Sequence, residues 1–101
     1  MNLVNIEFDP LALLELNDAV EYYNFKLKGL GDRFKKDVQL GLKRISDHPD
    51  AWQNQTARTR RFVLNSFPYK IVYTRKREKI IVLAIANSHR KPDYWVNRET
   101  T

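Results

Sequence analysis

The chain has 101 residues, a formal net charge of +6 and 43% hydrophobic residues, which indicates one domain (residues 1–101) with a single modest core. It has no cysteine, and its two histidines and its carboxylates lack ligand-like spacing, so disulfides are excluded and neither a metal nor another cofactor is expected. No signal peptide is visible ahead of the first predicted strand, and the longest apolar run (80–86) is too short to span a bilayer, so we expect a cytoplasmic protein without membrane contact.

The first half of the chain predicts a strand and two helices. Residues 3–8 favour β structure, and Asp9 and Pro10 then provide the cap and the first residue of a helix. Residues 29–31 contain two glycines that end this helix, and a second helix follows over about 32–47, up to a His-Pro-Asp stop. We expect the two helices to form an antiparallel hairpin. The apolar residues of the first helix that recur at helical spacing are Leu13, Leu16, Val20, Tyr23 and Leu27.

The second half changes to the period of two that is typical of strands. Three strands are predicted, over residues 60–64, 69–74 and 79–86, with polar turns at 65–68 and 75–78. The last strand is apolar on both faces, as expected for a central strand. The fold class is therefore α+β, with the order βααβββ and a helical hairpin packed on an antiparallel sheet. The other face of the sheet is expected to be only partly covered.

Positive charge is concentrated in the second half. Residues 1–50 contain seven basic and nine acidic residues, whereas residues 51–101 contain eleven basic and three acidic residues, a net charge of +8. Cations can simply keep a small protein soluble, but their segregation favours a basic face and an anionic partner. A basic nucleic-acid-binding module without toxicity would satisfy this observation by itself.

Several short motifs occur in a recognisable order along residues 8–98. They are Ala-Val-Glu-Tyr-Tyr at 19–23, Gly-Leu-Gly-Asp-Arg-Phe at 29–34, His-Pro at 48–49, Arg-Arg-Phe at 60–62, Phe-Pro-Tyr-Lys-Ile-Val-Tyr at 67–73, and His-Arg-Lys-Pro-Asp-Tyr-Trp at 89–95 with Arg98. With these motifs the chain resembles the RelE/ParE superfamily, the growth-inhibiting toxins of type II toxin–antitoxin systems. Many of its members are labelled plasmid stabilisation proteins.

The resemblance implies one of two activities. The RelE-like branch cleaves mRNA in the ribosomal A site, as a metal-independent endoribonuclease, whereas the ParE-like branch poisons DNA gyrase and is not itself a nuclease. Both branches are held inactive by an antitoxin whose disordered segment wraps the toxin. The expected partners are therefore a cognate antitoxin and either the ribosome with its mRNA or DNA gyrase.

RNA cleavage without a metal needs a base, an acid and cations that stabilise charge on the phosphate. Because histidine titrates near neutral pH, His89 could stand in as acid or base, although a solvent-facing loop residue is the more common role of such a histidine. Two positions depart from the nuclease pattern, because Lys70 replaces an arginine and Val63 stands where a second lysine is expected. The resemblance implies that the positions corresponding to the catalytic set of the family are Arg61, Lys70, Arg90 and Tyr94.

Five further cations of the basic half are predicted to contact nucleic acid. Arg60 and Arg61 are adjacent on a strand and must point to opposite faces, so they cannot both line one site. Residues 75–77 are more typical of a hairpin turn than of a phosphate clamp, and Trp95 is expected to close the core. The predicted nucleic-acid-binding residues are Arg58, Arg60, Arg75, Lys91 and Arg98.

Overall fold

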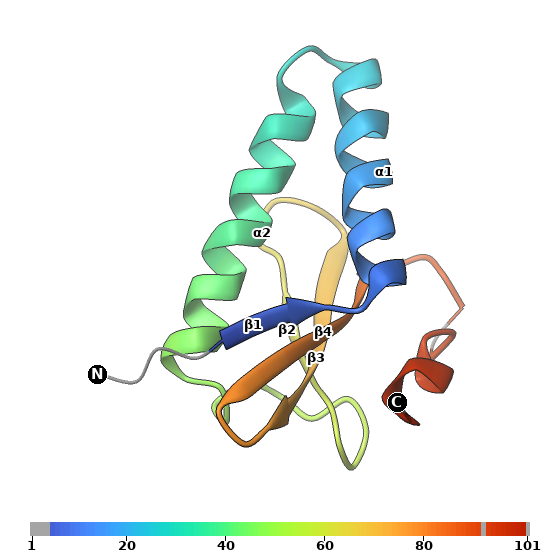
Figure 1. Ribbon diagram of the computed structural model, residues 1–101. Helices are drawn as coiled ribbons and strands as arrows, with labels where there is room; N and C mark the ends of the chain where they lie inside the picture. Colours follow the sequence, from blue (N-terminus) through green and yellow to red (C-terminus); the bar gives the residue numbers. More distant parts are fainter. Residues whose placement is uncertain (1–4, 92, 101) are drawn as a thin grey trace.

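The computed structural model describes residues 5–91 and 93–100, and it shows two helices packed on one face of a four-stranded sheet (Figure 1). The predicted α+β class and element order are confirmed. Residues 3 and 4 of the predicted first strand lie outside the described residues. The elements are β1 (Asn5–Phe8), α1 (Pro10–Lys26), α2 (Leu30–Asp47), β2 (Arg60–Val63), β3 (Tyr69–Lys76), β4 (Lys79–Asn87) and a short 3-10 helix, η1 (Val96–Thr100).

The strand order is β1-β4-β3-β2, which places β3 and β4 at the centre. β2, β3 and β4 are antiparallel neighbours, as predicted, but β1 pairs with β4 in parallel, with Phe8 opposite Val82. The sheet is therefore mixed. A parallel pair requires a long crossover between its strands, and residues 9–78 provide it. The residue pattern that identifies β1 as a strand carries no information on its direction.

Local chemistry determines where the helices begin and end. Asp9 caps α1, because its Oδ1 accepts a hydrogen bond from the backbone N–H of Leu11 at 2.9 Å. Gly29 has a φ of +86°, which favours glycine, and α2 starts directly after it, two residues earlier than predicted. A Cβ at Gly31 would collide with the backbone carbonyl oxygen of Val20, so only glycine permits the close approach of the two helices there.

The main core lies between the helices and the sheet. On α1 its buried residues are Ala12, Leu16 and Ala19. Leu13 and Leu27, two of the apolar residues that recur at helical spacing, are 45% and 59% exposed. Two alanines replace large side chains on the buried side, so the helix can lie close to the sheet. The other buried core residues are Phe34, Val38 and Ile45 of α2, Leu64, and Ile71, Tyr73, Ile80, Val82 and Ile85 of the central strands.

The far face of the sheet is covered in part by the C-terminal segment. Trp95 is 1% exposed and packs on Val72, Ala84 and Ala86, as expected for a residue that closes the core. A register shift pairs Val72 with Ala84 but Tyr73 with Val82, which leaves Leu83 as a bulge without a partner on β3. The bulge lies where the C-terminal segment approaches β4, and it frees backbone groups for new contacts.

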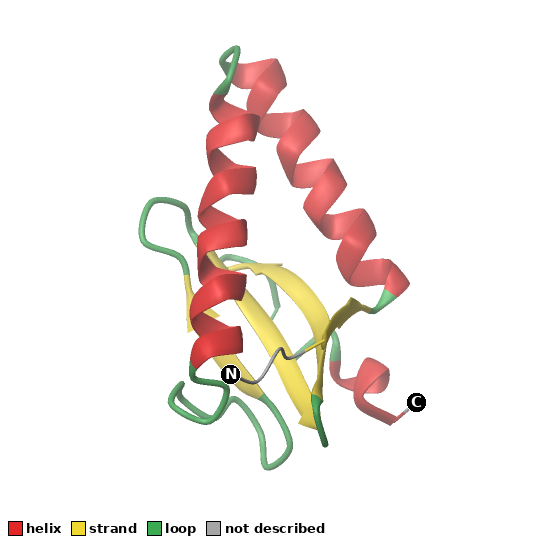
Figure 2. Cartoon of the chain, turned by 60° about the vertical axis from the view of Figure 1, so that its left-hand side comes forward, coloured by secondary structure: helices red, strands yellow, loops and turns green. Residues whose placement is uncertain are grey.

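The helical hairpin narrows toward its tip and projects beyond the sheet, as both views show (Figure 2). At this tip, Tyr22, Phe25 and Leu27 are 53%, 86% and 59% exposed.

In the described parts of the chain, no helix combines the length and the apolar character needed to cross a membrane. β3 extends to Lys76, so the turn before β4 contains only Arg77 and Glu78 and is shorter than the predicted turn at 75–78.

Candidate functional site

Tyr94, Arg90 and Arg98 meet around a carboxylate that the sequence analysis did not single out. The Tyr94 hydroxyl donates to Glu15 Oε2 at 2.6 Å, and Arg98 Nη1 donates to Glu15 Oε1 at 3.0 Å. Arg90 Nη1 lies 3.7 Å from Glu15 Oε2, and its guanidinium stacks on the Tyr94 ring at 3.9 Å. The side chains of Glu15 and Arg98 are only 15% and 13% exposed. We call these four residues the Glu15 cluster.

The Glu15 cluster occupies an edge that β1 leaves open. β1 ends opposite Val82, so the following residues of β4 lack a strand neighbour on that side. Glu15 Oε1 instead accepts the backbone N–H of Ile85 at 3.1 Å, and Arg98 Nη1 donates to the carbonyl of the bulge residue Leu83 at 2.9 Å. Backbone groups at a buried edge need such partners. The cluster therefore fastens the C-terminal segment to α1 and β4.

The environment of Tyr94 favours its neutral phenol. Burial raises the pKa of Tyr94, the hydrogen bond to Glu15 and the charge of that carboxylate raise it further, and the cations of Arg90 and Arg98 oppose the shift. The proton thus stays on the phenol and points at Glu15. In this state Tyr94 serves as a hydrogen-bond donor within the fold, and its hydroxyl is not directed at an incoming phosphate.

Arg61 and Lys70 meet at a second place, on the sheet face away from the helices. Arg61 Nη1 and Lys70 Nζ both donate to Gln55 Oε1, at 3.0 and 3.2 Å, and Gln55 Nε2 donates to Asp93 Oδ1 at 3.2 Å. The register pairs Val63 with Lys70, so the valine shares this face. Val63 is 59% exposed and leaves the face without a third cation at that point.

A small hollow of about 60 Å³ connects Lys70 with part of the Glu15 cluster. Lys70, Arg90 and Tyr94 all contribute to its wall, so the C-terminal segment does bring these predicted residues together. Lys91 and the acidic Asp93 line this hollow as well. The hollow is narrow, and the carboxylate of Asp93 reduces its attraction for an anion.

His89 is separate from these contacts. It is exposed in the loop after β4, where its backbone N–H donates to Asn87 Oδ1 at 2.8 Å. None of the hollows described here has His89 in its wall. The structure therefore places this histidine next to Arg90 in sequence but outside the small hollow that Arg90 lines.

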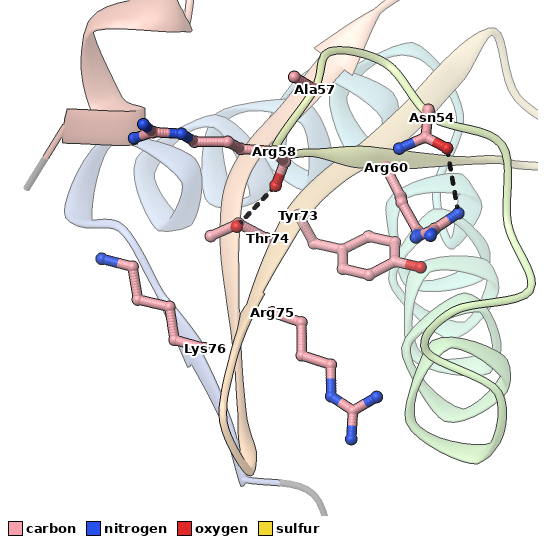
Figure 3. A pocket seen from close by; sticks show the side chains of 8 residues that line it. All are labelled: Asn54, Ala57, Arg58, Arg60, Tyr73, Thr74, Arg75 and Lys76. Atoms are coloured by element: carbon pink, nitrogen blue, oxygen red, sulfur yellow. Dashed lines mark hydrogen bonds between the residues drawn. The ribbon is translucent and has the colours of Figure 1, made fainter.

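Arg58, Arg60 and Arg75 lie at a third place, around a larger hollow beside β3 (Figure 3). Its volume is about 360 Å³, and Lys76, Tyr73 and Thr74 also line it. Arg60 and Arg61 point to opposite faces, as predicted, because Arg60 pairs with the core residue Tyr73 and Arg61 with Val72 on the far face. We call this hollow the β3 pocket.

The sequence analysis missed Glu15 and Gln55, and only Glu15 could have been identified from the sequence. Glu15 lies between Ala12 and Ala19 at helical spacing, on the side of α1 that faces the sheet. A carboxylate on a buried helix face requires a cation or a donor as partner, and this was a usable signal. Gln55 belongs to a loop without periodicity, and only the folded chain shows that two cations converge on it.

The chain matches a family model and is similar to solved structures. The family model described as the ParE toxin of the type II toxin–antitoxin system parDE matches residues 6–92. Among solved structures, a chain from the chromosomal ParDE system of P. aeruginosa is similar, with a TM-score of 0.74 and 13% identity over 84% of this chain and 96% of that chain. At this identity the structural similarity shows the fold alone. No curated protein sequence matches the chain.

Proposed function

This chain belongs to the ParE toxin family of type II toxin–antitoxin systems, and we propose that it inhibits growth by binding DNA gyrase and not by cutting mRNA. The RelE/ParE resemblance leaves both activities open, so the choice depends on whether the chain carries a nuclease site. The match to the ParE model favours the gyrase branch. The chemistry of the predicted catalytic residues favours it too.

The observation that carries this proposal is the internal use of the nuclease-like residues. Cleavage without a metal needs cations and an acid that can meet the phosphate as charge develops. The hydroxyl of Tyr94 donates to Glu15, and Arg61 and Lys70 share the oxygen of Gln55. The Tyr94 hydroxyl has a single proton and would have to leave Glu15 before it could act as an acid on RNA. A toxin that works by binding has no such requirement.

The proposal includes a cognate antitoxin that covers the outer side of the helical hairpin. Leu11, Leu14, Tyr22 and Phe25 lie on one side of α1 by helical periodicity, on either side of Asp18 along the helix, and are 50%, 54%, 53% and 86% exposed. An isolated protein gains by burying such a stripe against an amphipathic segment of a partner. Acidic residues of the same partner would then meet the basic half and cover Arg61, Lys70 and Arg90.

The decisive experiment is induction of the chain in growing cells, with parallel mapping of DNA breaks trapped on gyrase and of mRNA ends. We expect gyrase-linked breaks, no mRNA ends in the A site, and growth arrest that persists in the Lys70→Ala variant. Gly31→Val is the matched negative control, because its side chain collides with Val20 and disrupts the hairpin. Co-expression of the antitoxin should restore growth, and Phe25→Ser should weaken that rescue.

Two results would contradict the proposal. New mRNA ends at the A site with intact chromosomal DNA would identify a ribosome-dependent nuclease. Loss of toxicity in Lys70→Ala, with the fold preserved by circular dichroism, would assign this lysine to an active centre of the kind that the resemblance to RelE implies.

A further inference from the structure

We propose that the β3 pocket binds the phosphodiester backbone of a nucleic acid. Four cationic side chains contribute to its wall, from Arg58, Arg60, Arg75 and Lys76. The pocket is separate from the Glu15 cluster and from the Gln55 contacts, none of whose residues lines it. Binding of nucleic acid in the β3 pocket is independent of the proposed function, because it does not depend on whether the toxin acts on gyrase.

The pocket exists because the sheet is one strand short at this point. β2 begins at Arg60, opposite Tyr73, so residues 74–76 of β3 continue without a neighbour from β2. The loop before β2 bends over this edge, where Thr74 Oγ1 donates to the backbone carbonyl of Arg58 at 2.8 Å. A concave space of about 360 Å³ results. This space is several times the volume of the hollow beside Lys70, about 60 Å³.

Two of the arginines are held in place before any ligand arrives. Arg60 Nη1 donates to the carbonyl of Trp52 at 2.7 Å and to Asn54 Oδ1 at 3.3 Å. Arg75 Nη1 donates to Asp50 Oδ2 at 2.7 Å. Side chains fixed in this way lose little conformational entropy when an anion binds. Asp50 offsets part of the charge of Arg75, but its carboxylate is outside the pocket wall and 66% exposed.

Arg58 differs from these two arginines, since its guanidinium makes no hydrogen bond or ion pair with the residues that the structure describes. The described residues that line the pocket include no acidic side chain. A guanidinium presents several donors in one plane and suits the oxygens of a phosphate. In the Glu15 cluster the cations surround a carboxylate of the protein. In the β3 pocket no described wall residue supplies a carboxylate, so an anionic ligand can occupy the space between the cations.

The spread of the cations favours a chain of phosphates over a single small anion. Arg58 and Lys76 extend to one side of β3, while Arg60, Arg75 and the Tyr73 ring lie on the other (Figure 3). A backbone that crosses the strand edge would pass both pairs and meet a negative charge at each nucleotide. Contacts of this kind position a nucleic acid without reading its sequence. We therefore expect binding that is strong at low salt and indifferent to sequence.

The test is fluorescence anisotropy of the purified chain with a short labelled DNA duplex and with single-stranded RNA, over a range of salt concentrations. The double variant Arg58→Ala, Arg75→Ala should weaken binding roughly a hundredfold, about tenfold for each charge-assisted contact. It should also reduce the slope of log K against log salt by about 2. The control Lys35→Ala, Lys36→Ala removes the same charge from the exposed side of α2 and should change affinity less than about threefold.

Three results would overturn the proposal: equal losses in the two double variants, no binding of either nucleic acid at low salt, or displacement by polyglutamate as effective as displacement by unlabelled duplex. The last result would identify an acidic peptide as the occupant. The ratio of DNA to RNA affinity identifies the source of the phosphodiester. The single variant Arg58→Ala removes only an exposed side chain and therefore separates lost binding from lost folding.

Discussion

The Glu15 cluster and the β3 pocket draw on the same excess of positive charge but differ in what stands opposite it. In the cluster, a carboxylate from α1 accepts from Tyr94 and Arg98 and pairs with Arg90. In the β3 pocket, four cations line a concave space whose described wall holds no carboxylate. Arginine thus fastens the fold in the cluster, whereas in the pocket the guanidinium of Arg58 has no partner among the described residues. The difference depends on one acidic residue, Glu15, far away in the sequence.

The largest effect is expected at the centre of the cluster. Glu15→Gln keeps the shape of the side chain but removes the charge opposite Arg98, whose side chain is 13% exposed. Removing one partner of a buried ion pair is strongly unfavourable, so we expect a loss of about 3 kcal/mol in the free energy of unfolding. Urea denaturation measures it. Asp18→Asn, at an exposed position on the same helix, is the matched control and should change stability by less than about 0.5 kcal/mol.

If the free energy of unfolding of Glu15→Gln lies within about 1 kcal/mol of that of the parent, the contrast between the Glu15 cluster and the β3 pocket does not hold. It would mean that the cluster is only a set of solvated ion pairs, as weak as those usually found at protein surfaces. The tethering of the C-terminal segment gives an independent readout. The backbone N–H of Ile85 donates a hydrogen bond to the Glu15 carboxylate. If this carboxylate fastens the C-terminal segment, the variant should show faster amide hydrogen exchange at Ile85.

The elements were readable from the sequence because their periods are local properties. The helices, the three antiparallel strands and the centre of the sheet all followed from such patterns. The spacing of the large apolar residues does not identify the buried side of α1, because Ala12 and Ala19 are small and Leu13 is exposed. The direction of β1 and the partners of Glu15 depend on contacts between distant parts of the chain, which no local pattern encodes.

Alkaline pH provides a second, smaller test, because each region holds a tyrosine whose pKa is raised. Burial raises the pKa of Tyr73 to about 12 from 10.0, the nearby Arg60 opposes the shift, and Asp50 adds to it. Tyr73 donates to the carbonyl of Pro49 at 2.7 Å. Its neutral form is therefore favoured in the folded chain. This contribution to stability is fully present below pH 10 and is lost as the pH rises from about 10 to about 12.

The measurement is the free energy of unfolding of the parent and of Tyr73→Phe as a function of pH. At about pH 10.5 the parent should have lost about 1 kcal/mol through Tyr73, and the phenylalanine variant should lack this part of the decline. Tyr94 continues to titrate in both proteins, so the difference between the two curves isolates the β3 pocket from the Glu15 cluster. Parallel curves over the whole range would show that Tyr73 ionises as easily in the folded chain as in the unfolded one.

The smallest effect on stability is expected from Arg58→Ala, and its smallness is informative. Arg58 is exposed, and its guanidinium has no partner among the described residues, so its loss should change the free energy of unfolding by no more than about 0.5 kcal/mol. Arg60→Ala removes hydrogen bonds to Trp52 and Asn54 and should cost about 1 kcal/mol more. Thermal or urea unfolding of the two variants side by side gives the comparison. If Arg58→Ala proves as destabilising as Arg60→Ala, then Arg58 supports the fold and is not held open for a ligand. The difference between the Glu15 cluster and the β3 pocket would then fail at Arg58, where it is expected to be clearest.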